Sequence, residues 1–171
     1  MAKKATLYSL GFLFLFLVEA VFRPITLYGV SPMYVLCGVA AMGILEKEKF
    51  GAIFGLIFGL LCDFAGGSIF GSQALAFMIT GFIAGTLTEI TLSKSFISTL
   101  IITESSIVIF GGLKAIFYII LNDANPLSVV LYIMLPKFVL TLPFSILIYF
   151  MLKFLQNISA PNRERKRKRQ W

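Results

Sequence analysis

The sequence predicts an all-α membrane protein with six transmembrane helices, and its composition is the first reason. Of 171 residues, 58% are hydrophobic and 13% are charged, and the mean hydropathy is +0.93. A soluble domain carries about a quarter charged residues. The second reason is that runs such as Leu10–Val18 are apolar on every face, as lipid-exposed helices are and alternating outer-membrane strands are not. A soluble enzyme, a disordered chain and a small disulfide scaffold are excluded.

Six apolar segments come close to the roughly 20 residues that a spanning helix needs. Pro24 disfavours helix at the residue before it, which ends the first segment, and Ser31-Pro32 opens the second. Pro136 and Pro143 are expected as kinks in the sixth. The expected helices are Leu7–Phe22, the segment from Pro32 to Leu45, Phe50–Phe64, Ile69–Leu87, Phe96–Leu121 and Leu127–Gln156. Residues 1–160 form one transmembrane domain, followed by a basic tail at 161–171.

The distribution of basic residues predicts that both termini are cytoplasmic. With six spans and a cytoplasmic N-terminus, 12 of the 15 Lys and Arg residues lie on the inner side, Arg23 lies outside, and Lys114 and Lys137 lie within spans. Positive residues are retained on the cytoplasmic side. In the alternative topology, Lys3-Lys4 and the following apolar run are a cleaved signal peptide, which would leave five spans. The glutamate in Val18-Glu19-Ala20 argues against that cleavage site.

Glycines at four-residue spacing mark two of the expected helices. Gly51, Gly55 and Gly59 share one face of the third, and Gly81 and Gly85 repeat the spacing on the fourth. Small residues at this spacing let two helices approach closely in lipid. The face therefore predicts either packing within this protein or docking of a partner's helix, and the sequence leaves both open.

Charged residues within the spans are expected to pair, because an intramembrane charge costs roughly 2.5–3.5 kcal/mol. Glu19 precedes Arg23 by four residues, the favourable order for a helical ion pair. Glu104 lies about 12 Å from the inner end of the expected fifth helix and Lys137 about 15 Å from the outer end of the sixth. These depths nearly coincide, which predicts an ion pair. A proton relay at Glu104, lined by neighbouring hydroxyls, is the functional alternative.

Asp63 ends the third expected helix and precedes a turn that contains Gly66. A carboxylate there is expected to accept hydrogen bonds from backbone N–H groups of the turn and of the next helix's start. The basic tail is expected to contact anionic lipids, and nothing supports nucleic acid as a partner. The tail's basic residues are Arg163, Arg165, Lys166, Arg167, Lys168 and Arg169.

No catalytic, metal-binding or cofactor-binding constellation is expected. The sequence contains no histidine, and its two cysteines, Cys37 and Cys62, lie in apolar segments without CxxC spacing. No nucleophile elbow, HExxH motif or phosphate-binding loop is present. The connections between spans are too short to form a folded core outside the membrane.

The stretch from Pro32 to Gly85 resembles the rod shape-determining protein MreD family. The resemblance rests on the glycine-rich third helix, on Gly59-Leu60-Leu61-Cys62-Asp63-Phe64, and on the following Gly71 with Ala74-Leu75. Phe64 departs from the leucine that is commoner in the family. The resemblance implies that Gly55, Gly59, Asp63, Gly71 and Gly81 shape the turn between the third and fourth helices.

The resemblance also implies a function and a fold. It suggests a non-enzymatic inner-membrane subunit of the cell-elongation machinery that supports peptidoglycan synthesis and cell shape. Its partner would be an MreC-like protein, linked to a RodA-type glycosyltransferase and a class B penicillin-binding protein. The implied fold is similar to the S components of energy-coupling-factor transporters, so a vitamin-binding S component is the alternative. Against it, the first helix is bulky at Leu10–Leu17 and lacks the small-residue docking face of S components.

Overall fold

The computed structural model describes residues 2–22, 32–66, 71–90, 95–122 and 135–159, and all regular structure within them is helical. The first helix continues into a π-helical turn, η1 (Val18–Phe22), which completes the first expected segment. The α-helices are α1 (Ala2–Leu17), α2 (Tyr34–Glu46), α3 (Glu48–Gly66), α4 (Ser72–Ile90), α5 (Phe96–Asn122) and α7 (Leu135–Ser159). The prediction of an all-helical fold is confirmed.

Two expectations about the last helix differ from the structure. The prediction began this helix at Leu127, whereas α7 begins at Leu135, and residues 127–134 lie outside the described ranges. Pro136 therefore falls in the first turn of α7, where its missing N–H has no intrahelical acceptor to lose. The expected kink at Pro136 is wrong for this reason, while Pro143 does lie inside the helix.

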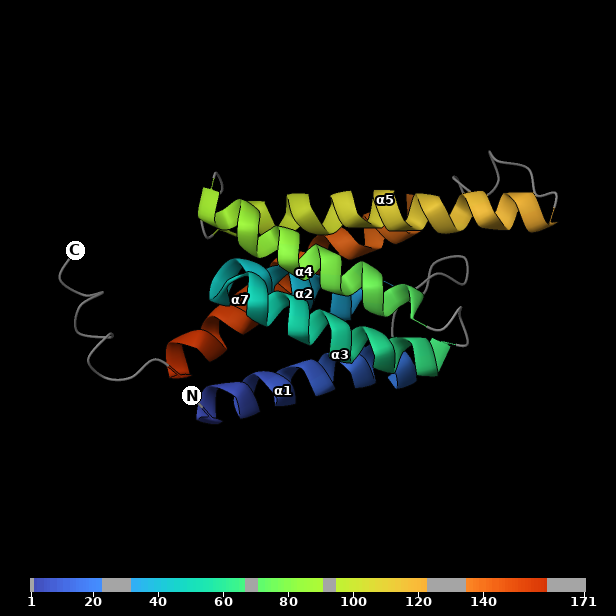
Figure 1. The fold of residues 1–171 in the computed structure, drawn as a ribbon. Helices are drawn as coiled ribbons and strands as arrows, with labels where there is room; N and C mark the ends of the chain where they lie inside the picture. Colours follow the sequence, from blue (N-terminus) through green and yellow to red (C-terminus); the bar gives the residue numbers. More distant parts are fainter. Residues whose placement is uncertain (1, 23–31, 67–70, 91–94, 123–134, 160–171) are drawn as a thin grey trace.

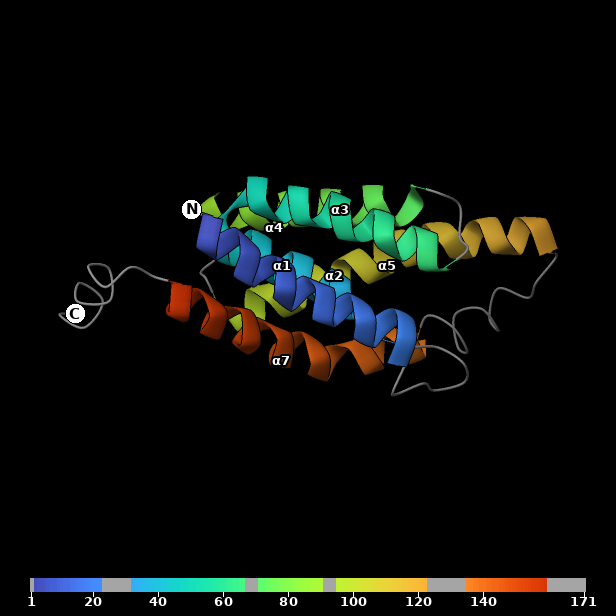
Figure 2. The same cartoon turned by 90° about the horizontal axis from the view of Figure 1, so that it is seen from below.

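Helix α2 is the centre of the molecule. Every residue from Tyr34 to Leu45 is buried, and α2 contacts each of the other five α-helices. Figures 1 and 2 show it enclosed by them, with α3 and α4 on one side and α1 and α7 on another. Its sequence contains Gly38, Ala40, Ala41 and Gly43, which allow close neighbours on several faces.

Aromatic side chains fill the space between α1 and α3. The ring of Phe12 lies 5.0 Å from Phe54 and 5.1 Å from Phe58, centroid to centroid. Such pairs stabilise by about 0.5–1.5 kcal/mol beyond the area they bury. On another side, Phe96 of α5 stacks at 6.2 Å on Phe150 of α7, so the start of α5 lies beside the second half of α7.

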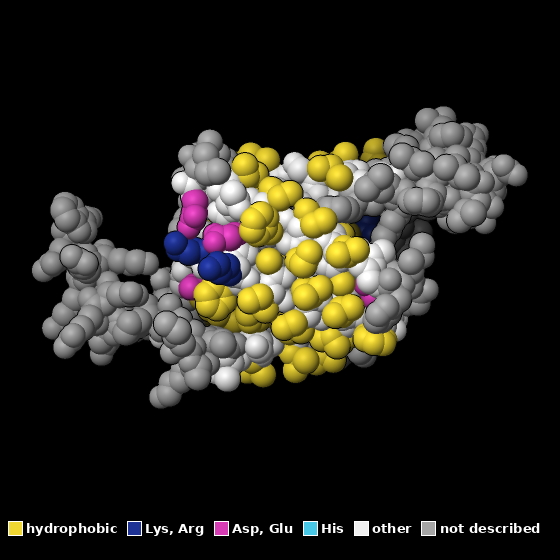
Figure 3. Space-filling model, viewed as in Figure 1, with side chains coloured by type: hydrophobic (Ala, Val, Ile, Leu, Met, Phe, Trp, Pro, Cys, Tyr) yellow, Lys and Arg dark blue, Asp and Glu magenta, His cyan; other side chains and the backbone are white. Residues whose placement is uncertain are grey.

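The outer surface of the bundle is largely apolar between its two ends. Each helix around α2 exposes large hydrophobic side chains, among them Leu10, Phe64, Phe82, Ile109 and Leu147. Figure 3 shows hydrophobic side chains covering the middle of the visible face, with most of the visible acidic and basic side chains gathered at one end. Soluble monomers rarely expose contiguous apolar patches beyond a few hundred Å². We call the end that carries Glu46, Lys47, Glu48, Lys49 and Glu89 the charged end.

Both the start of α1 and the end of α7 lie at the charged end (Figure 1). The connection between α2 and α3 is also there and is a single residue long. Lys47 caps α2 with φ +94°, and its N–H donates to the Gly43 carbonyl at 3.0 Å. Its ammonium forms an ion pair with Glu89 at 2.9 Å, which ties this turn to the end of α4 and raises the pKa of Lys47.

Candidate functional site: helix interfaces and an intramembrane cavity

The predicted glycine face lies between α3 and α4. A Cβ added to Gly51 would stand 2.5 Å from the carbonyl oxygen of Gly81, and one added to Gly59 would stand 2.5 Å from the Cα of Ala74. At Gly55 an added Cβ would collide with the carbonyl oxygen of Phe77. Real Cβ atoms do not approach backbone so closely, so the two helices meet at backbone distance along this whole face.

The same contact includes a glycine that the spacing did not indicate. A Cβ on Gly43 of α2 would collide with the Gly81 carbonyl oxygen, and one on Gly85 with the Glu48 backbone nitrogen. Gly43 was missed because α2 has no second glycine four residues away. The glycine face is thus filled by α2 and α4 of this protein. The sequence left open whether this face packs within the protein or binds a partner's helix. The geometry favours packing within the protein, because it leaves no space on this face for another helix.

Asp63 joins the end of α3 to the start of α4. Both of its carboxylate oxygens lie 3.1 Å from the backbone N–H of Gln73, and Oδ2 also lies 3.1 Å from that of Ala74. The first N–H groups of a helix have no intrahelical acceptor, so the carboxylate satisfies donors that would otherwise be orphaned. Its side chain is 2% exposed. This is the arrangement expected from the sequence.

The turn before α4 needs a glycine at Gly71. Its φ is +88°, a conformation that L side chains rarely adopt, and a Cβ there would meet no neighbour. The requirement is therefore one of backbone conformation and not of space. Gly66 is the last residue of α3, so the helix runs to the glycine where the turn was expected to begin.

The charged end contains a hydrogen-bond network that the sequence did not indicate. Tyr8 of α1 donates its hydroxyl to Glu46 Oε1 at 2.7 Å, and Gln156 of α7 donates to the same oxygen at 3.0 Å. The Gln156 amide also donates to the Leu45 carbonyl at 3.0 Å. Three helices that are distant in sequence thus meet at one carboxylate. The one sequence signal that could have indicated this network is the acidic residue Glu46 directly after an apolar run.

Glu19 makes a contact other than the expected one. Its Oε2 accepts a hydrogen bond from the backbone N–H of Val35 at 2.7 Å, at the start of α2. The carboxylate thereby caps a helix, as Asp63 does at α4. Arg23, its expected partner, lies outside the described residues, as do the side chain of Lys114 and the basic residues of the tail from Arg163 to Arg169.

The predicted ion pair between Glu104 and Lys137 is not formed. Glu104 is 6% exposed, and neither carboxylate oxygen has a hydrogen-bond partner. The prediction failed because it placed Lys137 ten residues into its helix, whereas Lys137 is the third residue of α7. It lies near Ile107 and Gly111 of α5, and Gly111 is about 10 Å along the helix from Glu104.

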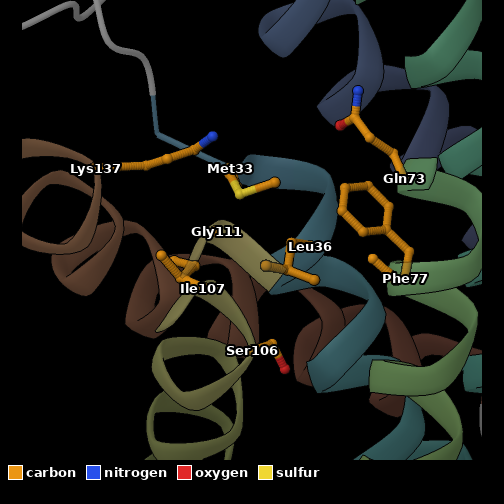
Figure 4. A pocket seen from close by; sticks show the side chains of 9 residues that line it. Met33, Leu36, Gln73, Phe77, Ser106, Ile107, Gly111 and Lys137 are labelled. Atoms are coloured by element: carbon orange, nitrogen blue, oxygen red, sulfur yellow. The ribbon is translucent and has the colours of Figure 1, made fainter. Parts of the chain in front are cut away.

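Lys137 instead lines a cavity of about 130 Å³ at the end opposite the charged end. Four helices meet there, since Lys137 belongs to α7. Met33 precedes α2 and Leu36 lies within it, α4 contributes Gln73, Ala76 and Phe77, and α5 contributes Ser106, Ile107 and Gly111. Figure 4 shows the polar ends of Lys137 and Gln73 on one side of the space, with Leu36, Ile107 and Phe77 below them and the Ser106 hydroxyl farthest away.

Ser106 belongs to a row of buried hydroxyls between α4 and α5. Thr80 donates to the Ser106 oxygen at 3.1 Å, and Ser106 donates to the Ile102 carbonyl at 2.8 Å. Thr103 donates to Thr99 O at 2.8 Å. These bonds satisfy the hydroxyls without Glu104. No group of three or more metal-binding side chains lies in the described part of the chain.

Comparison with known protein families decides the identity of this helical bundle. The model of the family described as rod shape-determining protein MreD matches residues 3–158, which is nearly the whole bundle. The chain belongs to the MreD family. No curated protein and no solved structure matches it.

Membership of the MreD family gives the chain a role in determining rod shape and places it in the bacterial inner membrane. Members of the family are shape-determining structural proteins and are not known as enzymes. By length and composition, one helix within the described ranges qualifies as membrane-spanning, Leu135–Ile158. Three shorter apolar helices are Thr6–Ala20, Tyr34–Glu46 and Phe96–Ile109.

Proposed function

We propose that this protein is a non-enzymatic scaffold of the bacterial cell-elongation complex, which binds the transmembrane helix of an MreC-like protein. Through that partner it would support peptidoglycan synthesis by a RodA-type glycosyltransferase and a class B penicillin-binding protein. The observation that carries the proposal is the MreD family match over residues 3–158. The chemistry of the chain agrees with it, because the sequence lacks histidine and the described residues contain no group of three or more metal-binding side chains.

We propose further that α1 with η1, α2, α3, α4, α5 and α7 each cross the membrane, with both termini in the cytoplasm. Helices α3 and α4 have 19 residues each, which corresponds to about 28 Å, close to the hydrocarbon thickness of about 30 Å. The apolar belt over these helices supports this topology, as does the charged end beside the start of α1 and the end of α7. In this orientation the charged end faces the cytoplasm.

The packing of the bundle limits where the partner's helix binds. Helix α2 is enclosed by protein, and the glycine face of α3 is occupied by α4. The faces that remain are the apolar outer surfaces of the surrounding helices, such as Ile53, Leu56 and Ile57 on α3 or Leu147, Phe150 and Phe154 on α7. Association there would depend on packing against lipid-facing side chains.

Two features of the described residues favour the scaffold over the alternative of a vitamin-binding S component, and the similarity of fold to those proteins stays a prediction. Sites for drug-sized ligands usually have volumes of about 300–1,000 Å³, whereas the cavity beside Lys137 has about 130 Å³. Helix α1 also exposes Leu10, Leu13 and Phe14 where an S component would present small residues to its energising module.

Co-purification tests the proposed function. The tagged full chain, extracted from its native membrane in mild detergent, should recover an MreC-like protein above the level found with an unrelated multi-span membrane protein carrying the same tag. Recovery of an ATP-binding cassette module in place of that protein would overturn the proposal. Cross-linking before extraction distinguishes a partner lost to detergent from one that never binds.

A further inference from the structure

Glu104 of α5 is a buried carboxyl group without a hydrogen-bond partner. The residue is 6% exposed, and neither carboxylate oxygen accepts a hydrogen bond. Acidic side chains are almost never fully buried unless they are paired, because an isolated charge is costly in an apolar interior. We infer that Glu104 is a proton-binding site of the helical bundle. The folded protein holds the neutral acid, and release of the proton weakens the contact between α5 and α7.

Glu104 lies on the face of α5 that turns towards the start of α7. Glu104, Ile107 and Gly111 are spaced by three and four residues, so they share one face of the helix. Ile107 and Gly111 line the same cavity as Lys137 of α7. A change in the charge of the Glu104 carboxyl group is therefore felt at the contact between these two helices.

Helix α7 places two buried hydroxyl groups at the level of Glu104. The two helices are antiparallel (Figures 1 and 2), and Phe96 stacks on Phe150 at 6.2 Å. Glu104 is eight residues along α5 from Phe96. Eight residues back along α7 from Phe150 lies between Thr141 and Ser145, which are 0% and 1% exposed. The surroundings of the carboxyl group are thus polar although they are closed to solvent.

The hydroxyl groups around Glu104 use their protons elsewhere. Thr141 and Ser145 each donate to a backbone carbonyl of α7, at 2.6 and 2.8 Å. Thr103, next to Glu104, donates to a backbone carbonyl of α5 at 2.8 Å. An ionised carboxylate only accepts hydrogen bonds, whereas a neutral carboxylic acid also has an O–H to donate. Hydroxyl oxygens that have already donated can still accept, so these surroundings suit the protonated form.

The ionisable groups on the described parts of the neighbouring helices do not bond to Glu104. Helix α5 contacts α2, α4 and α7. Lys137 lies about 7.5 Å along α7 from the level of Glu104, and Lys114 lies about 15 Å along α5. A proton is therefore the cation that neutralises the carboxylate. The described ionisable side chains of the three neighbouring helices are Tyr34, Cys37, Glu46, Glu89, Lys137, Tyr149 and Lys153.

The cavity beside Lys137 gives the site a route to water. Ile107, one helical turn from Glu104, lines this cavity, whose volume of about 130 Å³ is room for several water molecules. Proton exchange needs water or another proton carrier near the carboxyl group. The cavity places such a space about one turn away, on the same face of α5.

Infrared spectroscopy of the purified full chain in detergent tests the inference directly. A neutral carboxylic acid has a C=O stretching band that a carboxylate lacks. At neutral pH we expect this band in the wild-type protein and its loss in Glu104→Gln. Glu89→Gln is the matched control, because Glu89 is an exposed acid paired with Lys47, and it should retain the band. Raising the pH should remove the band from the wild-type protein.

The stability of the bundle should depend on pH through the same residue. In the unfolded chain Glu104 meets water and ionises well below neutral pH, so unfolding at neutral pH releases its proton. The equilibrium constant for unfolding should then rise by up to about tenfold for each pH unit, the limit for one proton. This contribution to stability is complete in acid and is lost as the pH rises. Glu104→Gln, which has no proton to lose, should remove it, and Glu89→Gln should retain it.

Two results would overturn the inference. One is an equal carboxylic acid band in the wild-type protein and in Glu104→Gln, and the other is an equal dependence of their unfolding on pH. If Glu104→Gln does not fold, Glu104→Leu gives the same two comparisons, since it also removes the carboxyl group. Neither measurement involves a protein partner, so the result is independent of the proposed function.

Discussion

At the scale of single residues, four acidic side chains of the bundle fall into two groups. Asp63, Glu19 and Glu46 each accept hydrogen bonds that join one helix to another. Glu104 is buried without any hydrogen-bond partner for its carboxylate oxygens. Native proteins satisfy nearly all buried polar groups, and the exceptions commonly have a functional reason. The first group therefore stabilises the fold, whereas Glu104 weakens it.

Asp63→Ala should destabilise the protein, because three hydrogen bonds at the start of α4 are lost together. The expected loss is about 1–3 kcal/mol, the cost of leaving buried donors unsatisfied. Asp63→Asn should lose less, since its amide oxygen can still accept. Thermal unfolding in detergent measures both. Glu89→Ala, which breaks the exposed pair with Lys47, is the control and should change stability little. An equal effect of Asp63→Ala and Glu89→Ala would show that the cap contributes nothing.

Glu104→Leu should stabilise the protein, by about 1–3 kcal/mol if the carboxyl group is buried without compensation. The control is Ser105→Leu, one residue along on an exposed part of α5, which should have a small effect. Combining Glu104→Leu with Lys137→Leu should give additive changes within about 0.5 kcal/mol, since the two residues do not interact. If the changes in the free energy of unfolding are clearly non-additive, the two side chains do interact, which would contradict the structure.

At the scale of helices, the sequence was informative wherever a local pattern determines structure. The spacing of Gly51, Gly55 and Gly59 identified the contact face of α3, and the position of Asp63 before a glycine turn identified its role. The same spacing could not tell whether the helix on that face belongs to this chain. That choice depends on how α3 and α4 are connected and packed, which a single helix does not encode.

The wrong prediction of the ion pair between Glu104 and Lys137 comes from the position of a helix end. Depths in the membrane were counted from the ends of apolar runs, so the eight-residue difference at the start of α7 moved Lys137 from the middle of a span to its first turn. The network of Tyr8, Glu46 and Gln156 was missed for a different reason. It joins residues 38 and 110 positions apart, and no local periodicity relates them.

Gly55→Ala should strongly destabilise the contact between α3 and α4. An added methyl group would collide with backbone atoms of Phe77 and Met78, which cannot move without displacing α4. Overpacking costs about 1–3 kcal/mol, and a rigid backbone neighbour places the loss at or above the upper end. Gly11→Ala is the matched control, because its methyl group would meet the flexible end of Leu155 at 3.1 Å. It should be neutral or stabilising, since alanine favours helix by about 1 kcal/mol. Similar unfolding temperatures for the two variants would contradict the backbone contact.

At the scale of the whole molecule, polarity is arranged along the helix axes. Charged side chains gather where α1 begins and α7 ends, whereas the opposite end holds Asp63, Gln73 and the cavity beside Lys137. An apolar belt separates the two ends. Around a central helix enclosed by protein, the five outer helices expose large hydrophobic side chains over their described residues. Such a surface suits lateral contacts within the membrane.

The two ends should face opposite sides of the membrane, and single cysteines can report this. The native Cys37 and Cys62 are buried, so they should react little in the folded protein. Lys49→Cys places an exposed thiol at the charged end, and Ala65→Cys places one near the end of α3 on the opposite side. Positive residues are retained in the cytoplasm. A membrane-impermeant maleimide should therefore label Ala65→Cys in intact spheroplasts, and Lys49→Cys only after the membrane is permeabilised. Labelling of both positions from the same side would mean that α3 does not cross the membrane, and the reversed pattern would place the charged end, with the start of α1 and the end of α7, outside the cell.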